Sequence, residues 1–130
     1  SGMPVKDAME KLKSEVQPDL IFCHWGGDSH QDHRFLSELT WNTFRNHLIL
    51  EYEIPKYDGD FGNPNVYVSL EPDIRERKIA HILLSYSSQS SREWFDSDTF
   101  TAVLRLRGME CRAESGYAEA FYSRKLAIRT

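Results

Sequence analysis

The segment "DLIFCH", residues 19–24, is a short apolar run between Pro18 and the glycine pair Gly26-Gly27. Strands of a parallel sheet are buried on both faces and read as continuous apolar runs of this length, so the segment is typical of a parallel strand. Parallel strands need crossover connections between them, and these are most often helices. The segment therefore predicts a fold in which strands alternate with helices.

The rest of the chain provides this alternation. In the first half of the chain we expect a helix over 4–16, the strand at 19–24, a helix over 31–47, a strand over 48–54 and a turn-rich loop over 55–65. A strand over 66–70 follows, and then a helix with Ser69 as its cap and Pro72 in its first turn. The chain ends with a helix over 96–111, with Gly108 near its end, and an extended segment over 117–128 whose first residues also suit a helix. This order predicts an α/β layered fold with a small parallel or mixed sheet flanked by helices. In such a fold a ligand site is expected beyond the carboxyl end of a strand.

Length and charge narrow the classes of partner. The 130 residues suit one domain, 1–130, and the net charge of −4 is spread along the chain without a basic stripe, which argues against a nucleic-acid partner. We find no apolar run of a membrane span and no signal peptide, and two widely spaced cysteines favour reduced thiols in a cytoplasmic protein. Residues 1–3 resemble a tag remnant followed by a start, so Met3 is either the native start or the first residue of a fragment.

A cluster of histidines and aspartates follows the apolar strand directly. The stretch "HWGGDSHQDHR", residues 24–34, ends with His30, Asp32 and His33, and His30 and His33 are three positions apart at the start of the expected helix. That spacing places both rings on one side of a helix. A catalytic zinc uses three protein ligands, often histidines, and a carboxylate such as Asp32 can orient a histidine through its second nitrogen. The cluster suits a metal or catalytic site, while a polar loop with Ser29 or Asp28 as helix cap explains the same residues.

Three motifs in order give a family resemblance. The "HQDH" of residues 30–33 resembles the HxDH motif of the PIG-L/LmbE-like zinc-dependent N-deacetylases, "SYSSQSSR" (85–92) is similar to the family's serine–glutamine segment, and "GYAEAFYSRK" (116–125) to its closing motif. The resemblance implies a partial Rossmann-like fold, a zinc cofactor, and hydrolysis of an N-acetyl group, usually from an N-acetylglucosamine unit. The stretch "IPKYDGDFGNPNVYV" (54–68) also resembles a bacterial branch that acts on small sugars or sugar conjugates.

The resemblance also implies roles for single residues. His33 would be a zinc ligand, and a protonated His30 would stabilise the tetrahedral oxyanion, with Asp32 hydrogen-bonded to His30 to keep it charged. Glu119, in the closing motif, would lie near the site. Zinc would lower the pKa of its bound water towards about 7.

The family's other half is not found in this sequence. An "HPDDE" type of motif, which carries a zinc-binding histidine and aspartate and the general base, has no counterpart; "EPDIRE" (71–76) is similar only superficially, since it has no histidine. His24 and Asp28 are the nearest substitutes. We therefore expect that this chain alone is incomplete: a fragment of a longer deacetylase, half of a split enzyme, or an inactive product. An uncovered sheet edge would then favour a dimer or a swapped assembly.

The remaining site candidates each have a structural alternative. Trp25 suits stacking on a sugar but also packing under the loop. Asp28, Tyr57, Asp58 and Glu119 are predicted substrate contacts, although Tyr57 and Asp58 also suit a solvated turn, and the roles of Gln89 and Arg92 stay open. Two other functions remain: a non-catalytic module that binds sugar or self-associates, and a metal-binding domain without turnover.

Overall fold

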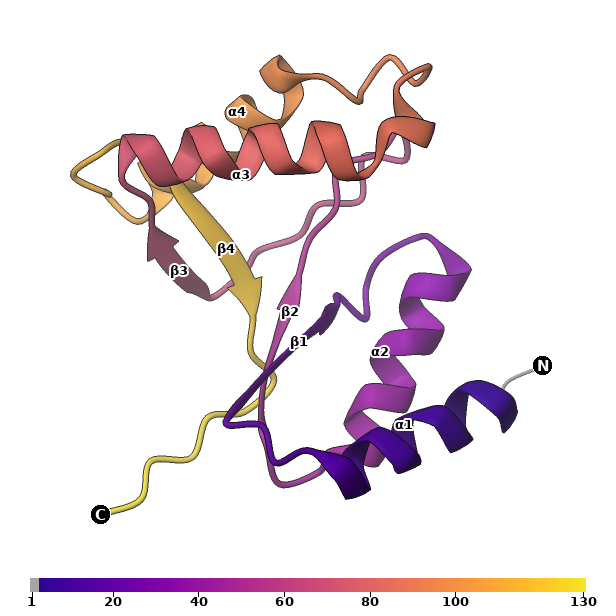
Figure 1. Ribbon diagram of the computed structural model, residues 1–130. Coiled ribbons are helices and arrows are strands. Elements are labelled where there is room, and N and C mark those ends of the chain that lie inside the picture. The colour runs from indigo at the N-terminus through magenta and orange to yellow at the C-terminus, as the bar shows by residue number, and fades with distance from the viewer. Residues whose placement is uncertain (1–2) are drawn as a thin grey trace. The chain divides into compact units, whose positions relative to one another are not determined.

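The computed structural model describes residues 3–130, which divide into two compact units (Figure 1). The first unit comprises the chain up to Ile54 together with Phe121–Thr130, and the second comprises Pro55–Ala120. The predicted tag remnant at positions 1 and 2 lies outside the described residues. No helix in the described part is long and apolar enough to cross a membrane.

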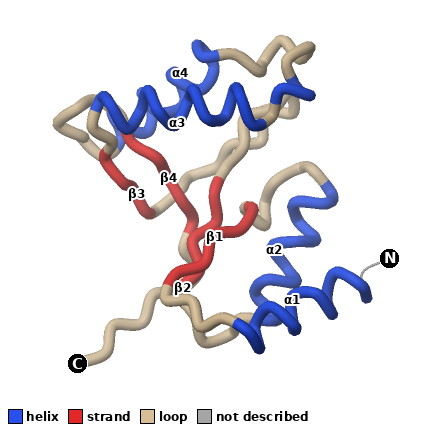
Figure 2. Tube along the Cα trace, viewed as in Figure 1, coloured by secondary structure: helices blue, strands red, loops and turns tan. Residues whose placement is uncertain are grey.

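The order of helices and strands confirms the α/β prediction (Figure 2). The elements are α1 (Met3–Glu15), β1 (Leu20–His24), α2 (Gln31–Thr43), β2 (Leu48–Tyr52), β3 (Val66–Ser69), α3 (Pro72–Ser85), the 3-10 turn η1 (Ser87–Gln89), α4 (Ser97–Glu110) and β4 (Ala118–Tyr122). The sheet is mixed and has the order β1-β2-β4-β3. Strands β1 and β2 are parallel, as expected, while β4 runs antiparallel to β2.

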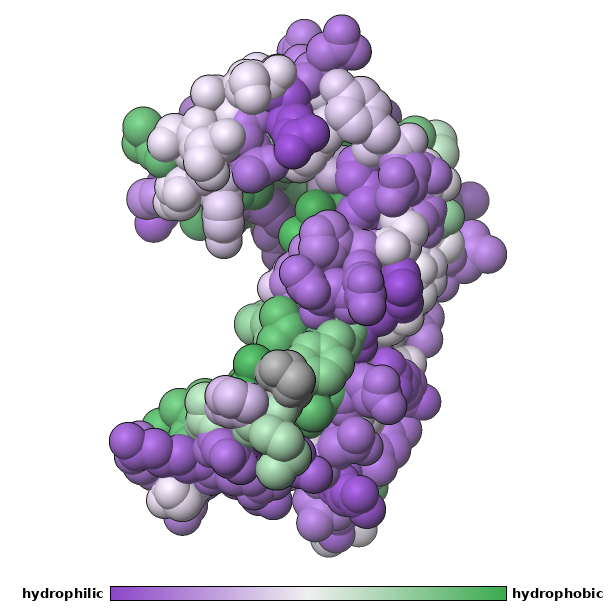
Figure 3. Space-filling model, turned by 90° about the vertical axis from the view of Figure 1, so that its right-hand side faces the viewer, coloured by the Kyte–Doolittle hydropathy of each residue, from purple (hydrophilic) through white to green (hydrophobic). Residues whose placement is uncertain are grey.

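The first unit is built on the β1–β2 pair. The register runs from Leu20 opposite Leu48 to His24 opposite Tyr52. Helix α2 packs on β1, helix α1 packs on α2, and the small core consists of Cys23, Phe44 and Ile49. Within Met3–Glu15 no residue is buried, and in β1 the ring of Phe22 is 54% exposed. Apolar side chains therefore reach the surface, and Figure 3 shows such green patches.

The second unit has its own core. Helices α3 and α4 pack together around Leu70, Ile79, Phe95, Phe100 and Leu104. Asp96 caps α4 by accepting the backbone N–H of Thr99 at 2.7 Å. This capping contact sets the start of α4 at Ser97, close to the predicted boundary.

Two predicted boundaries are wrong. Helix α2 ends at Thr43 rather than 47, because Phe44 leaves helical geometry to enter the core. Ser69 ends β3 instead of capping α3, whose N-cap is Glu71. Gly108 lies near the end of α4, as predicted, and a side chain there would collide with the backbone of Gly116.

Candidate functional site

The histidine cluster lies at the carboxyl end of β1, where an α/β fold is expected to place a ligand site. Residues 25–30 form the loop that leads into α2. The Trp25 N–H donates to the carbonyl of Tyr52 at 3.0 Å, and the Asp28 N–H donates to the carbonyl of Trp25 at 3.1 Å. The Arg34 guanidinium donates back to the carbonyls of Asp28 (3.0 Å) and Ser29 (2.6 Å). The loop is therefore fixed from both of its ends.

Asp28 is the centre of this loop and is only 1% exposed. Its Oδ1 accepts the backbone N–H of His30 at 2.7 Å, and its Oδ2 lies 3.1 Å from Nδ1 of His33. The second contact has the distance of an ion pair without the angle of a hydrogen bond. A carboxylate beside one nitrogen of a metal-binding histidine orients the ring and leaves the other nitrogen for the metal. Asp28 therefore holds the loop through the His30 N–H and lies beside Nδ1 of His33, besides the substrate contact predicted for it.

His30 is the N-cap of α2, so the helix cap expected from the sequence exists but is neither Ser29 nor Asp28. Its Nδ1 accepts the backbone N–H of Asp32 at 3.1 Å. A nitrogen that accepts a hydrogen bond carries no proton, so the proton of the neutral ring is on Nε2. This contact between His30 and Asp32 thus runs through the backbone of Asp32, and a cationic His30 would have to give up the capping bond.

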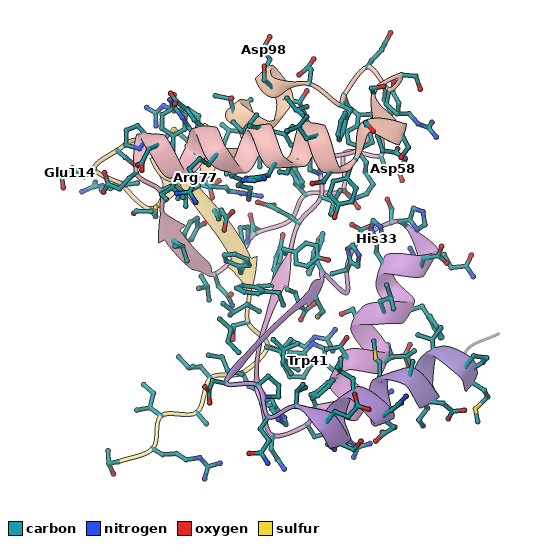
Figure 4. All side chains as sticks on the ribbon, viewed as in Figure 1. His33, Trp41, Asp58, Arg77, Asp98 and Glu114 are labelled. Atoms are coloured by element: carbon teal, nitrogen blue, oxygen red, sulfur yellow. The ribbon has the colours of Figure 1, made fainter. Side chains whose placement is uncertain are left out.

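The three imidazole rings form a column. The rings of His24 and His33 stack with centroids 3.8 Å apart and planes within 3°, and those of His30 and His33 with centroids 4.4 Å apart and planes at 18°. Beyond His24 lies Tyr52, with its hydroxyl 3.4 Å from the His24 Nε2. Figure 4 shows His33 at the start of α2 and Trp41 near the end of that helix.

Stacked rings do not make a ligand set. The lone pairs of imidazole lie in the ring plane, so parallel rings direct them side by side rather than to one point. Accordingly, no group of three His, Cys, Asp or Glu side chains within residues 3–130 is placed to hold a metal ion. The described chain offers one oriented candidate ligand, His33, and a zinc ion held by several of these rings would require the column to open.

Three of the other predicted residues contact neighbouring side chains or backbone. Trp25 stacks on Tyr122, with centroids 4.3 Å apart and planes within 6°, as its packing alternative expects. The Tyr57 hydroxyl accepts the backbone N–H of Glu93 at 3.2 Å, and Glu119 forms an ion pair with Lys78. Tyr57, Asp58 and Glu119 all belong to the second unit, whereas the histidine column belongs to the first.

Sequence reasoning misses two features of the site. It gives Asp28 a substrate contact or a helix cap, and does not indicate that the Asp28 carboxylate lies beside Nδ1 of His33. It also passes over Glu51, an acidic residue inside the apolar run "LILEYEI", which is 1% exposed in the structure. An acid in a strand that is otherwise apolar is the available signal.

Comparison with known proteins shows the fold. No family model and no curated protein sequence matches the chain. Among solved structures it is similar to the conserved protein TT1542 from Thermus thermophilus (18% identity, TM-score 0.70, 98% of this chain and 59% of that one). It is also similar to GalB, the 4-carboxy-2-hydroxymuconate hydratase from Pseudomonas putida KT2440 (15%, 0.74, 100% and 62%), and to the zinc-inhibited form of teicoplanin deacetylase Orf2 (17%, 0.70, 92% and 50%).

The matched structures are longer than this chain and differ in activity. The chain spans 50% to 62% of the length of these three structures. They include a deacetylase and a hydratase, so the fold by itself does not select the reaction. At these identities they show that the chain shares the α/β fold of these structures, and they do not show its reaction.

Proposed function

We propose that this chain is part of a zinc-dependent N-deacetylase that removes an N-acetyl group from an N-acetylglucosamine-type sugar or sugar conjugate. The observation that carries the proposal is the Asp28–His33 pair at the carboxyl end of β1. It lies in a fold shared with deacetylases of teicoplanin and of the A40926 pseudoaglycone. The family resemblance of "HQDH" adds the reaction class.

His33 is the proposed metal ligand of this chain. With Asp28 beside Nδ1, its Nε2 is the nitrogen left for zinc. A bound zinc supplies Lewis-acid chemistry and an activated water. Because the described residues offer no complete ligand set, the remaining ligands and the general base would come from sequence outside these 130 residues.

His30 is the proposed donor to the reacting carbonyl oxygen. It is exposed at the start of α2, and the Asp32 N–H bound at Nδ1 leaves the Nε2–H as its donor. A donor aimed at the developing oxyanion is worth about 3–4 kcal/mol in other acyl-transfer sites. Trp25, Tyr57, Asp58 and Glu119 remain proposed substrate contacts.

The test compares two forms of the protein: the 130-residue chain, and a longer form that carries the sequence preceding it in the reading frame. Zinc is measured by mass spectrometry and turnover by release of acetate from N-acetylglucosamine conjugates. We expect stoichiometric zinc and turnover only in the longer form, and loss of both in its His33→Ala variant. His81→Ala, which alters an exposed histidine of α3, is the matched control and should retain both.

Other outcomes would overturn parts of this proposal. Tight zinc with turnover in the 130-residue chain would show that the site is complete without further sequence. Zinc without turnover in the longer form would favour a metal-binding domain, and sugar binding with neither would favour a non-catalytic module.

Self-association is a separate part of the proposal. Strand β1 lies at one end of the sheet order, and Leu20 and Phe22 are 40% and 54% exposed on it. Edge strands with exposed apolar side chains tend to pair with other chains. We expect a dimer in sedimentation, and a monodisperse monomer would contradict this expectation.

A further inference from the structure

Glu51, in β2, is a buried carboxylate that accepts four hydrogen bonds. Its Oε1 accepts the backbone N–H of Gly26 at 2.6 Å and the hydroxyl of Ser37 at 3.3 Å. Its Oε2 accepts the indole N–H of Trp41 at 3.2 Å and the Nε–H of Arg124 at 2.8 Å. A buried charge is costly unless it is paired and fully hydrogen-bonded, and this one is both.

Arg124 reaches this carboxylate from the segment after β4. Its Nη2 also donates to the Ser37 hydroxyl at 3.2 Å, and its guanidinium lies 4.8 Å from the ring centre of Trp41. It sits so close to the loop that a Cβ on Gly26 would be 2.5 Å from Nη2. Carboxylate, guanidinium and glycine are therefore fitted to one another, all within the first unit.

The contacts of β2 hold the histidine loop at two successive residues. The carbonyl of Tyr52 accepts the N–H of Trp25, and the carboxylate of Glu51 accepts the N–H of Gly26. Two residues later, Asp28 holds the His30 backbone and lies beside the His33 ring. The path from Glu51 to the histidines thus consists of three consecutive residues, Gly26 to Asp28, with fixed partners at both ends.

We propose that Glu51 is a positioning residue for the histidine column, and that Arg124 is the partner that keeps its carboxylate aimed at Gly26. The four donors to the Glu51 carboxylate include none of the three histidines, so Glu51 acts on them through the backbone of the loop. What the histidines do rests on the proposed function, whereas their positioning by Glu51 does not.

Native-state hydrogen exchange of backbone amides, followed by NMR on the 130-residue chain, tests this role without metal, substrate or turnover. The Glu51→Gln variant keeps the size of the side chain and one acceptor oxygen but removes the charge. A charge-assisted hydrogen bond is roughly twice as strong as a neutral one, so we expect the Gly26 amide to exchange about tenfold faster. The His30 amide, which bonds to Asp28 and not to Glu51, should speed up with it, while amides of Leu48–Tyr52 keep their rates.

The matched control lies in the second unit. Glu110→Gln also removes a carboxylate from an arginine, Arg107 at 2.9 Å, and should leave the Gly26 and His30 amides unchanged. If Glu51→Gln does not fold, Arg124→Gln serves instead and should produce a smaller rise in the same two amides. A rise at Gly26 alone, a uniform rise through the whole first unit, or no rise at His30 would each overturn the positioning role. Failure of the deacetylase assays would leave these exchange results untouched, so the two proposals fail separately.

Discussion

Replacing Gly26 with alanine tests whether this position is glycine because of Arg124. The new Cβ would lie 2.5 Å from Nη2 of Arg124, but 3.4 Å from Glu51 Oε1 and from Ser37 Oγ. The last two distances are ordinary contacts. Only the guanidinium therefore has to move, and it is the far end of a flexible side chain.

The cost follows from what the guanidinium loses when it moves. Arg124 would give up its hydrogen bonds to Glu51 (2.8 Å) and Ser37 (3.2 Å). Hydrogen bonds to charged groups are worth about 1.5–3 kcal/mol when buried, but Arg124 is 47% exposed, so solvent reduces the loss to about 1–2 kcal/mol. Glycine-to-alanine replacement gains about 0.4–1 kcal/mol by restricting the unfolded chain. We expect Gly26→Ala to lower the free energy of unfolding by about 0.5–1.5 kcal/mol.

A double-mutant cycle separates this collision from other effects. In an Arg124→Ala background the collision is gone, so adding Gly26→Ala should be neutral or slightly stabilising, giving a coupling energy of about 1–2 kcal/mol. Urea unfolding followed by tryptophan fluorescence measures all four proteins, since Trp25 and Trp41 both lie in the first unit. Free energies that add to within about 0.5 kcal/mol would refute the reasoning.

Three further predictions concern single side chains. Gly108→Ala should lower the free energy of unfolding by about 1–3 kcal/mol, because its Cβ meets the backbone of Gly116. An unchanged Tm would contradict this packing. Burial, and next the charge of Glu51, raise the pKa of the Cys23 thiol from 9.0 to about 11, so iodoacetamide should not label Cys23 at pH 8. The stability that the neutral thiol contributes should be complete below pH 9 and lost as pH rises through 11. Burial acts to raise the pKa of Glu110, but hydrogen bonds from Tyr67 and Arg107 outweigh it and lower this pKa. Tyr67→Phe should therefore lower the free energy of unfolding at pH 7 by about 0.5–1 kcal/mol. An equal loss of free energy of unfolding at pH 3 would argue against that hydrogen bond.

Elements with a local signal could be predicted from the sequence. The strand Leu20–His24 is marked by an apolar run between a proline and two glycines, and α1 by an apolar stripe of helical spacing. Both signals depend on neighbours a few positions away. The same is true of the position of the histidine cluster at the end of β1, which follows from the strand itself.

Features that depend on distant partners could not be predicted. Glu51 stands out as an acid in an apolar run, but the sequence does not indicate its burial or its hydrogen bond from Arg124, 73 positions later. The need for glycine at position 108 is a second case, because nothing near it in sequence indicates that the backbone of Gly116 packs there. The ring stacking of His24 on His33 likewise depends on how β1 and α2 pack, which spacing alone does not specify.

The hydrogen bond between Glu51 and Arg124 also has a consequence for synthesis of the chain on the ribosome. The two residues are 73 positions apart, and chains grow at about 5–20 residues per second, so Glu51 waits roughly 4 to 15 s for its partner. During that time the chain between them, including all of the second unit, is being made. The loop that carries the histidines therefore gains this contact only after the residues of the second unit have been made.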